Sequence, residues 1–212
     1  MSLKITEIFY SLQGETNTVG YPTVFVRLTG CPMRCTYCDT AYAFHGGKHR
    51  ELDEIVSEVA TYGAKHVTVT GGEPLVQPEC HQLMKQLCDQ GHFVSLETGG
   101  AMDISKVDPR VYIVLDIKTP ASNEEPNNTY SNLDHIKPTD CFKFVICDQA
   151  DYQWSKDFVA KHKLTERCDV FFSPSADQLD ATMLADWIVE DRLAVRLQIQ
   201  LHKVLWANEA GR

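Results

Sequence analysis

The sequence predicts an α/β fold, an incomplete (β/α) TIM-like barrel of about six parallel strands in a single domain over residues 1–212. Apolar, β-branched runs recur at intervals of about 25 to 30 residues, with helix-like stretches between most of them. Most of these runs do not alternate with polar residues, which is typical of parallel strands buried on both faces. Six or seven such units are too many for a small open sheet and too few for a complete barrel of about eight.

Seven apolar runs are the expected strands. They cover residues 23–28, 66–70, 93–97, 111–117, 141–146, 169–173 and 195–201. Four stretches between them are helix-like, and the last carries its apolar residues on one stripe. The expected helices cover residues 51–62, 78–90, 151–163 and 178–190.

The last run, residues 195–201, differs from the others because it alternates. Its odd-numbered positions are apolar, and the even-numbered positions from Arg196 to His202 are polar. We therefore expect one face of this strand to pack on the core. The other face is expected to meet either water or a polar ligand in the barrel cavity.

The composition narrows the possible partners and surroundings. The formal charge of −9 and the pI of about 5.3 argue against a groove for nucleic acid, which would need a basic excess. No apolar window is long enough to span a membrane, and the first residues lack a signal-peptide pattern, so we expect a cytoplasmic protein. The eight cysteines are then expected to be reduced. Five of them suit the core, namely Cys80, Cys88, Cys141, Cys147 and Cys168.

The other three cysteines, Cys31, Cys35 and Cys38, follow the first expected strand within eight residues. One interpretation is a structural zinc site completed by His45 or His49. A second is an iron–sulfur cluster with a fourth, remote cysteine. A third is a cubane cluster held at three irons, whose fourth iron is left for a substrate or cofactor.

A glycine-rich element favours the third interpretation. Gly71, Gly72, Glu73 and Pro74 follow the expected strand at 66–70, and two glycines let a ligand approach the backbone closely. A simple tight turn is the alternative.

Polar residues also stand at the carboxyl ends of several expected strands, where ligands bind in parallel α/β folds. These residues are Thr70, Glu97, Thr98, Asp116, Lys118 and Ser173.

The two elements together resemble the radical S-adenosylmethionine superfamily. The shared features are the CxxxCxxC spacing, the aromatic Tyr37 before the last cysteine and the GGEP segment. The chain further resembles the 7-carboxy-7-deazaguanine synthase family over most of its length. The matching segments are FYSLQGE (9–15), VFVRLTGCPMRCTYCDT (24–40), VTGGEP (69–74), SLETGG (95–100) and QLHK (200–203).

This resemblance implies a carbon–nitrogen lyase with a 4Fe-4S cluster, S-adenosylmethionine and Mg²⁺. The implied reaction contracts the ring of 6-carboxy-5,6,7,8-tetrahydropterin and gives 7-carboxy-7-deazaguanine and ammonia, on the route to queuosine and related 7-deazapurines. The implied partners are this small pterin, a flavodoxin-like electron donor and a second copy of the chain in a homodimer. Neither nucleic acid nor a membrane is expected.

The resemblance also implies site residues, and no side chain has a catalytic role beyond holding the cluster and cofactor. Cys31, Cys35 and Cys38 would hold the cluster, and Thr40 the Mg²⁺ ion. The substrate residues would be Leu12, Gln13, Gly14, Glu15, Arg27, Thr70 and His202. The cofactor residues would be Tyr37, Gly71, Gly72, Glu73, Glu97, Asp116, Ile117, Lys118, Ser173, Pro174, Ser175 and Ala176.

Two other functions remain as alternatives. An activase of glycyl-radical enzymes shares the cysteine spacing, but it would not need the segments at 9–15 and 200–203. A metal or iron–sulfur binding module without catalysis would need neither the two glycines nor Arg27. The chain also departs from the family at Gly100, where many relatives have Ser or Asn, and in the nine residues that follow Lys203.

Overall fold

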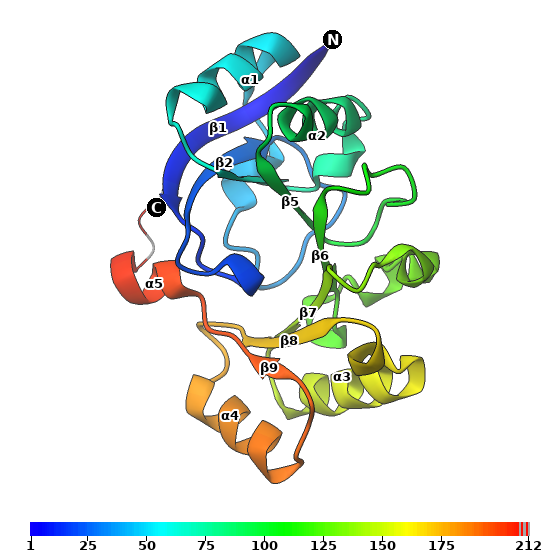
Figure 1. Cartoon of the computed structure of the whole chain (residues 1–212). Helices are drawn as coiled ribbons and strands as arrows, with labels where there is room; N and C mark the ends of the chain where they lie inside the picture. The colour runs from blue at the N-terminus through cyan, green and yellow to red at the C-terminus, as the bar shows by residue number, and fades with distance from the viewer. Residues whose placement is uncertain (208, 210, 212) are drawn as a thin grey trace.

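The computed structural model describes residues 1–207, 209 and 211, which form one sheet of nine strands with helices on its outer side (Figure 1). The strand order is β3-β1-β2-β4-β5-β6-β7-β8-β9, and every pairing from β2 to β9 is parallel. Within the described residues the end strands β3 and β9 do not pair, so the sheet is an open barrel. The predicted single α/β domain with a mainly parallel sheet is confirmed. The parallel strands are β2 (Pro22–Leu28), β4 (His66–Gly71), β5 (Phe93–Thr98), β6 (Tyr112–Ile117), β7 (Cys141–Ile146), β8 (Asp169–Pro174) and β9 (Arg196–Leu197).

Two strands were missing from the sequence prediction. β1 (Ser2–Leu12) lies between β2 and β3 (Lys48–Glu51) and is antiparallel to both. Leu3 and Ile5 are buried and alternate with polar neighbours, which was the available signal. The register then shifts between Ile5 and Glu7, so the alternation does not continue along β1.

The four predicted helices are present, with ends within three residues of the expected ones. They are α1 (Leu52–Thr61), α2 (Cys80–Asp89), α3 (Gln149–His162) and α4 (Ala181–Glu190). Asp148 and Asp180 cap the amino ends of α3 and α4, and their side chains accept hydrogen bonds from backbone N–H groups of the first turn. Short 3₁₀ helices cover Thr16–Thr18, Ala41–Phe44, Pro74–Val76, Pro120–Ser122, Glu125–Asn127, Tyr130–His135 and Leu164–Glu166.

The prediction of a strand over residues 195–201 is wrong over most of its length. β9 ends at Leu197, and a short helix, α5 (Leu201–Trp206), replaces its second half and lies beside the carboxyl end of β1 (Figure 1). The expected burial is also reversed, since Leu197 and Ile199 are 40% and 45% exposed whereas Gln198 is 7% exposed. The chain leaves the sheet because the Leu201 N–H donates to Gly14 O, which draws this segment across the barrel.

The five cysteines expected in the core lie there. Cys80, Cys141 and Cys147 are buried, and Cys88 and Cys168 are partly buried against the main apolar cluster. All eight cysteines are free thiols. None of the described helices combines the length and the apolar composition that a membrane span requires.

Candidate active site

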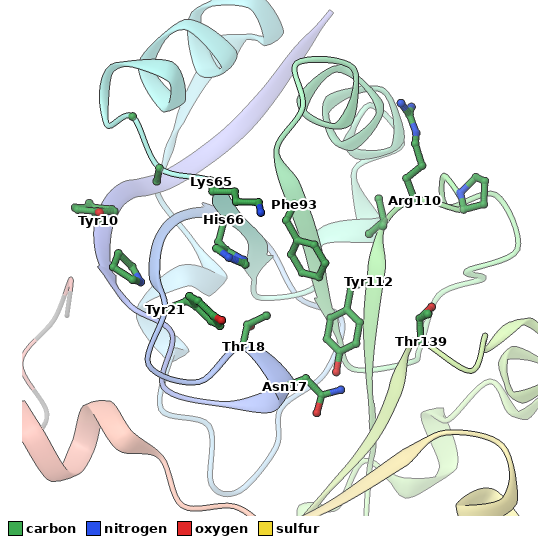
Figure 2. Close-up of a pocket in the computed structure, with 15 residues that line it drawn as sticks. Tyr10, Asn17, Thr18, Tyr21, Lys65, His66, Phe93, Arg110, Tyr112 and Thr139 are labelled. Carbon is green, nitrogen blue, oxygen red and sulfur yellow. The ribbon is translucent and has the colours of Figure 1, made fainter.

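Two cavities lie at opposite ends of the parallel strands. The one at the amino ends has a volume of about 820 Å³ and is lined by aromatic rings (Figure 2). Tyr21 stacks on His66 at 4.7 Å between ring centroids, and His66 in turn contacts Phe93 at 5.1 Å. None of the residues implied by the resemblance lines this cavity.

The second cavity, of about 570 Å³, lies at the carboxyl ends of the strands. It is lined by every residue that the resemblance implies except Glu73 and Ile117. The structure therefore brings together residues from both halves of the chain. This is the end of a parallel barrel at which ligands bind.

The cysteine loop follows β2 and is fixed by hydrogen bonds to one later segment of the chain. Cys31, Cys35 and Cys38 are partly exposed and line the cavity. The Thr36 N–H donates to Ser122 O at 3.2 Å, and the Arg34 N–H donates to the Glu124 carboxylate. The segment around residues 120–125 thus holds the loop against the sheet. His45 and His49, the proposed fourth ligands of a zinc site, are exposed and do not line this cavity.

The glycine pair after β4 lies directly against the cysteine loop. A Cβ atom on Gly72 would stand 2.3 Å from Gly30 O and 2.7 Å from the Cys31 Cβ. Gly71 has a φ of +155°, which L residues rarely adopt. The Glu73 N–H donates to Gly30 O at 2.8 Å. Glycine is required here because the two loops touch through their backbones.

Glu73 itself is fully buried and does not reach the cavity. Its carboxylate accepts hydrogen bonds from the Thr98 hydroxyl and from the backbone N–H groups of Gly99 and Leu75. Burial raises the pKa of Glu73, and these donors oppose that rise. In this arrangement the carboxylate joins the ends of β4 and β5. Ile117 also points away, into the core, because side chains alternate along β6.

Asp116 and Lys118, on either side of Ile117, do line the cavity. Lys118 Nζ is 3.1 Å from Asp116 Oδ2 and 5.8 Å from the centre of the Tyr37 ring. The other Asp116 oxygen and the Tyr37 hydroxyl are buried without a hydrogen-bond partner among the described residues. Such orphaned polar atoms in a cavity wall fit a polar ligand.

Another part of the cavity wall is a hydrogen-bonded polar network. Gln13 Nε2 donates to Thr68 Oγ1 at 3.0 Å and to Glu97 Oε1 at 3.3 Å, and Thr70 Oγ1 donates to Glu97 Oε2 at 3.0 Å. Burial raises the pKa of Glu97, and the nearby Glu15 carboxylate raises it further. The resemblance assigns Glu97 to the cofactor, but its carboxylate accepts hydrogen bonds from Gln13 and Thr70, which are both assigned to the substrate.

Arg27 is held at the edge of this wall by Glu7. The Arg27 Nε–H donates to Glu7 Oε1 at 2.7 Å, and the guanidinium lies 5.7 Å from the Phe9 ring centre and 5.8 Å from that of Tyr42. The Nη groups make no hydrogen bond within the described part of the chain. A planar guanidinium that is held through its Nε–H can offer its Nη groups to a carboxylate.

The segment around α5 covers the cavity. Gln200 Nε2 donates to Glu15 Oε1 at 2.8 Å and to Asp39 Oδ2 at 3.3 Å, and Lys203 Nζ lies 3.4 Å from Asp39. The Thr40 hydroxyl also donates to Asp39, at 2.8 Å. Partial burial opposes ionisation of Asp39, but Thr40 and Lys203 lower its pKa to about 2. Beyond α5, the cavity is lined by Ala207, Glu209 and Gly211.

Sequence reasoning missed Lys143, which lines the cavity from the middle of β7 and is ion-paired with Glu15. The signal was a single charged residue inside the apolar run 141–146. It also missed the contacts that Glu7 and Asp39 make. Gly100, by contrast, has no role in the cavity, since its φ is +74° and its missing Cβ would face Leu115 in the core.

The three thiols fit a cubane cluster. In the described residues, no three His, Cys, Asp or Glu side chains converge on a point where one metal ion would sit. A cubane needs a wider arrangement, because each thiolate binds a different iron. Gly71 and Gly72 line the cavity beside these thiols, where a ligand of the remaining iron would lie.

Comparison with known proteins agrees with this site. Residues 25–136 match the family model of the radical SAM superfamily. The chain is 44% identical to 7-carboxy-7-deazaguanine synthase of Chlorobaculum tepidum, over 98% of this chain and 96% of that relative. It is 40% identical to the synthase of Koribacter versatilis, over 98% of each.

The fold agrees as well. The crystal structure of QueE from Escherichia coli superimposes with a TM-score of 0.80 at 21% identity, over 95% of both chains. This likeness confirms the partial barrel. The superfamily implies a 4Fe-4S cluster and S-adenosylmethionine. From its full-length relatives and its cysteine motif, the chain belongs to the 7-carboxy-7-deazaguanine synthase family of radical SAM enzymes.

Proposed function

We propose that the chain converts 6-carboxy-5,6,7,8-tetrahydropterin to 7-carboxy-7-deazaguanine and ammonia, in the biosynthesis of queuosine or a related 7-deazapurine. The observation that supports this most is that the thiols and the Gln13–Glu97 network line one cavity. The product equals the substrate minus ammonia, so the reaction needs no net oxidant. A radical initiator that is regenerated in each turnover suffices.

Cys31, Cys35 and Cys38 would hold the 4Fe-4S cluster, and Gly71 and Gly72, which line the cavity beside them, would contact S-adenosylmethionine. When bound, these groups supply the radical that starts the reaction by hydrogen abstraction. The orphaned Asp116 oxygen and Tyr37 hydroxyl would then bind polar groups of the cofactor. The remaining proposed cofactor contacts, with Glu97, Lys118 and the segment 173–176, lie in the same cavity.

The substrate would lie against the network of Gln13, Thr70 and Glu97. Arg27 would bind its carboxylate through the Nη groups, and Gln13 and Glu15 would bind polar atoms of its ring. Thr40, with the ionised Asp39 beside it, would hold Mg²⁺, which prefers oxygen ligands. The segment around α5, with His202 over Gly14, would keep water from the bound substrate.

We further propose a homodimer in the cytoplasm that receives electrons from a flavodoxin-like donor. The dimer, the compartment and the electron donor are inferred from what is usual in the family. A flavodoxin-type donor suits an enzyme whose cluster must be reduced before it can generate a radical. Sedimentation of the reconstituted protein would test the dimer directly.

The deciding experiment is anaerobic turnover. The reconstituted enzyme, given S-adenosylmethionine, Mg²⁺ and a reductant, is incubated with the carboxytetrahydropterin, and the product is identified by mass. We expect 7-carboxy-7-deazaguanine and one ammonia for each substrate consumed. Formation of neither, together with a glycyl radical on a partner protein, would favour the activase instead.

A further inference from the structure

Lys143 is a nearly buried cation in the wall of the candidate site, and the resemblance assigns it no role. It lies beside Asp116 in the register of β6 and β7. Its ammonium is ion-paired with Glu15, and the two side chains are 12% and 11% exposed. Burial alone would lower the pKa of Lys143, but the carboxylates of Glu15, Asp116 and Glu97 hold it above its usual value. Lys143 is therefore charged at neutral pH.

Glu15 faces the same cavity with both of its oxygens in use. Oε1 accepts from Gln200 Nε2 at 2.8 Å, and Oε2 pairs with Lys143. Burial opposes its ionisation, but Lys143 outweighs burial and lowers the pKa of Glu15. A buried ion pair adds little stability compared with apolar residues of similar shape. Its position in a cavity wall therefore favours a role toward a ligand.

The proposed substrate has an edge that complements this pair. The pyrimidinone ring of a pterin presents, in order, a carbonyl oxygen, a ring N–H and an exocyclic amine. A matching surface must offer one donor followed by two acceptors. A lysine ammonium next to a carboxylate offers that pattern, and each carboxylate oxygen can accept more than one hydrogen bond. The product, a 7-deazaguanine, keeps the same edge.

We infer that Lys143 and Glu15 together recognise this edge, with Lys143 donating to the ring carbonyl and Glu15 accepting from the ring N–H and the amine. This inference rests on the proposed function, from which it takes the substrate. Lys143 is then a specificity-determining residue, because a ligand that lacks the carbonyl leaves one buried N–H donor of the ammonium without an acceptor. The structural alternative is that Lys143 only neutralises Glu15.

Two ligands that differ at one atom separate these roles. The first probe is 6-carboxypterin, the oxidised and unreactive form of the substrate. The second is its 4-thio analogue, which keeps both donors but replaces the carbonyl oxygen with sulfur, a weaker acceptor. Affinities are measured by calorimetry under anaerobic conditions, with the reconstituted enzyme saturated with S-adenosylmethionine. The wild type is expected to prefer the oxygen ligand about tenfold.

The test variant is Lys143→Met, which removes the charge and keeps most of the length. We expect it to bind 6-carboxypterin at least about tenfold more weakly and to lose the preference for oxygen over sulfur. The wild type and Lys143→Met, each measured with the oxygen and the sulfur ligand, then form a double-mutant cycle. The matched control is Lys137→Met, whose ammonium pairs with Asp140 and does not line the site. It should leave both affinities unchanged.

Lys143→Met leaves the Glu15 carboxylate buried without a cation, so the fold must be checked by circular dichroism. If that variant does not fold, Glu15→Gln/Lys143→Met removes both charges and is the better test. It too should lose the preference for oxygen. A variant that weakens both ligands equally, with the wild-type preference intact, would overturn the inference. If the wild type neither turns over the carboxytetrahydropterin nor binds 6-carboxypterin, the proposed function itself fails.

Discussion

Gly14 and His202 lie so close that a Cβ atom on Gly14 would stand 2.2 Å from His202 Nδ1. Because the Leu201 N–H also donates to Gly14 O, this one glycine fixes where α5 begins and where the cover of the cavity lies. We predict that Gly14→Ala displaces α5 and increases its digestion by a protease. The KM for the pterin should rise, while the global unfolding free energy changes by less than about 1 kcal/mol, since α5 is peripheral.

The control for this prediction is a second substitution that relieves the contact. His202→Ala removes the imidazole, so Gly14→Ala/His202→Ala should regain resistance to the protease, although not full activity. Equal digestion of the single and the double variant would contradict the prediction.

Gly72→Ala should have a different and larger effect. Its Cβ would meet backbone atoms of the cysteine loop, Gly30 O at 2.3 Å and Gly30 C at 2.7 Å, which cannot rotate away. We expect the loop to shift and the iron and sulfide content after anaerobic reconstitution to fall to less than about half of the four irons per cubane. The matched control is Gly99→Ala, whose Cβ would meet the flexible end of Met33 at 2.3 Å. It should load iron normally.

The residues of the site that could be predicted are those that belong to local sequence patterns. The cysteine spacing and the GGEP segment are local patterns, so the residues at 31–38 and 71–72 were found from sequence. Lys143 was not, because its role depends on Glu15, which is 128 residues away in the chain. Long-range pairing of this kind leaves no local pattern. The same limit applies to the contact between Arg27 and Glu7, which forms only because β1 and β2 pair; Arg27 itself was predicted.

The fold, too, was predictable in some elements and not in others. Uniformly apolar strands and their helices were predicted to within a few residues, because both faces of each strand are buried. β1 was missed because its register shift interrupts the alternation, and β9 was overextended because α5 forms instead. Alternation predicts a strand with an apolar buried face, but here Gln198 is buried and donates to Thr16 O, whereas Leu197 and Ile199 are exposed.

The raised pKa of Glu97 predicts a pH dependence of stability. A carboxyl group whose pKa is higher in the folded state than its usual 4.5 stabilises the fold most at low pH, and this stability is lost as the pH rises through the folded pKa. Glu97→Gln has no proton to lose at this position. The unfolding free energy of the wild type should therefore fall relative to that of Glu97→Gln as the pH rises from 4.5, by about 1.4 kcal/mol for each unit of the pKa rise. Urea unfolding of both proteins at several pH values measures this difference, and parallel curves would argue against it.

Cys35→Ala should abolish both cluster and turnover. A cubane held by three thiolates has no protein ligand to replace one of them, so iron content and activity are expected to fall together. Cys88→Ala is the matched control, because Cys88 is a partly buried thiol on α2 that packs against the core. It should lower stability slightly and leave the iron content unchanged. Full iron and turnover in Cys35→Ala would exclude Cys35 as a ligand.

Arg27→Lys tests whether the guanidinium binds the substrate carboxylate. Glu7 takes the Nε–H at 2.7 Å, so the Nη groups are left for a second, bidentate partner. A lysine can make one of these two contacts but not both, since its ammonium is a single point charge. We expect the KM for the carboxytetrahydropterin to rise about tenfold or more, while cleavage of S-adenosylmethionine without product continues. The release of methionine measures that cleavage.

The same substitution away from the cavity provides the control. Arg50 pairs with Glu58 on α1 and does not line the site, so Arg50→Lys should change neither quantity. If Arg27→Lys also leaves the KM unchanged, Arg27 only joins β2 to β1 through Glu7. Its loss would then appear as a lower unfolding free energy, by about 1 kcal/mol for a half-buried ion pair, and not as weaker binding of the pterin.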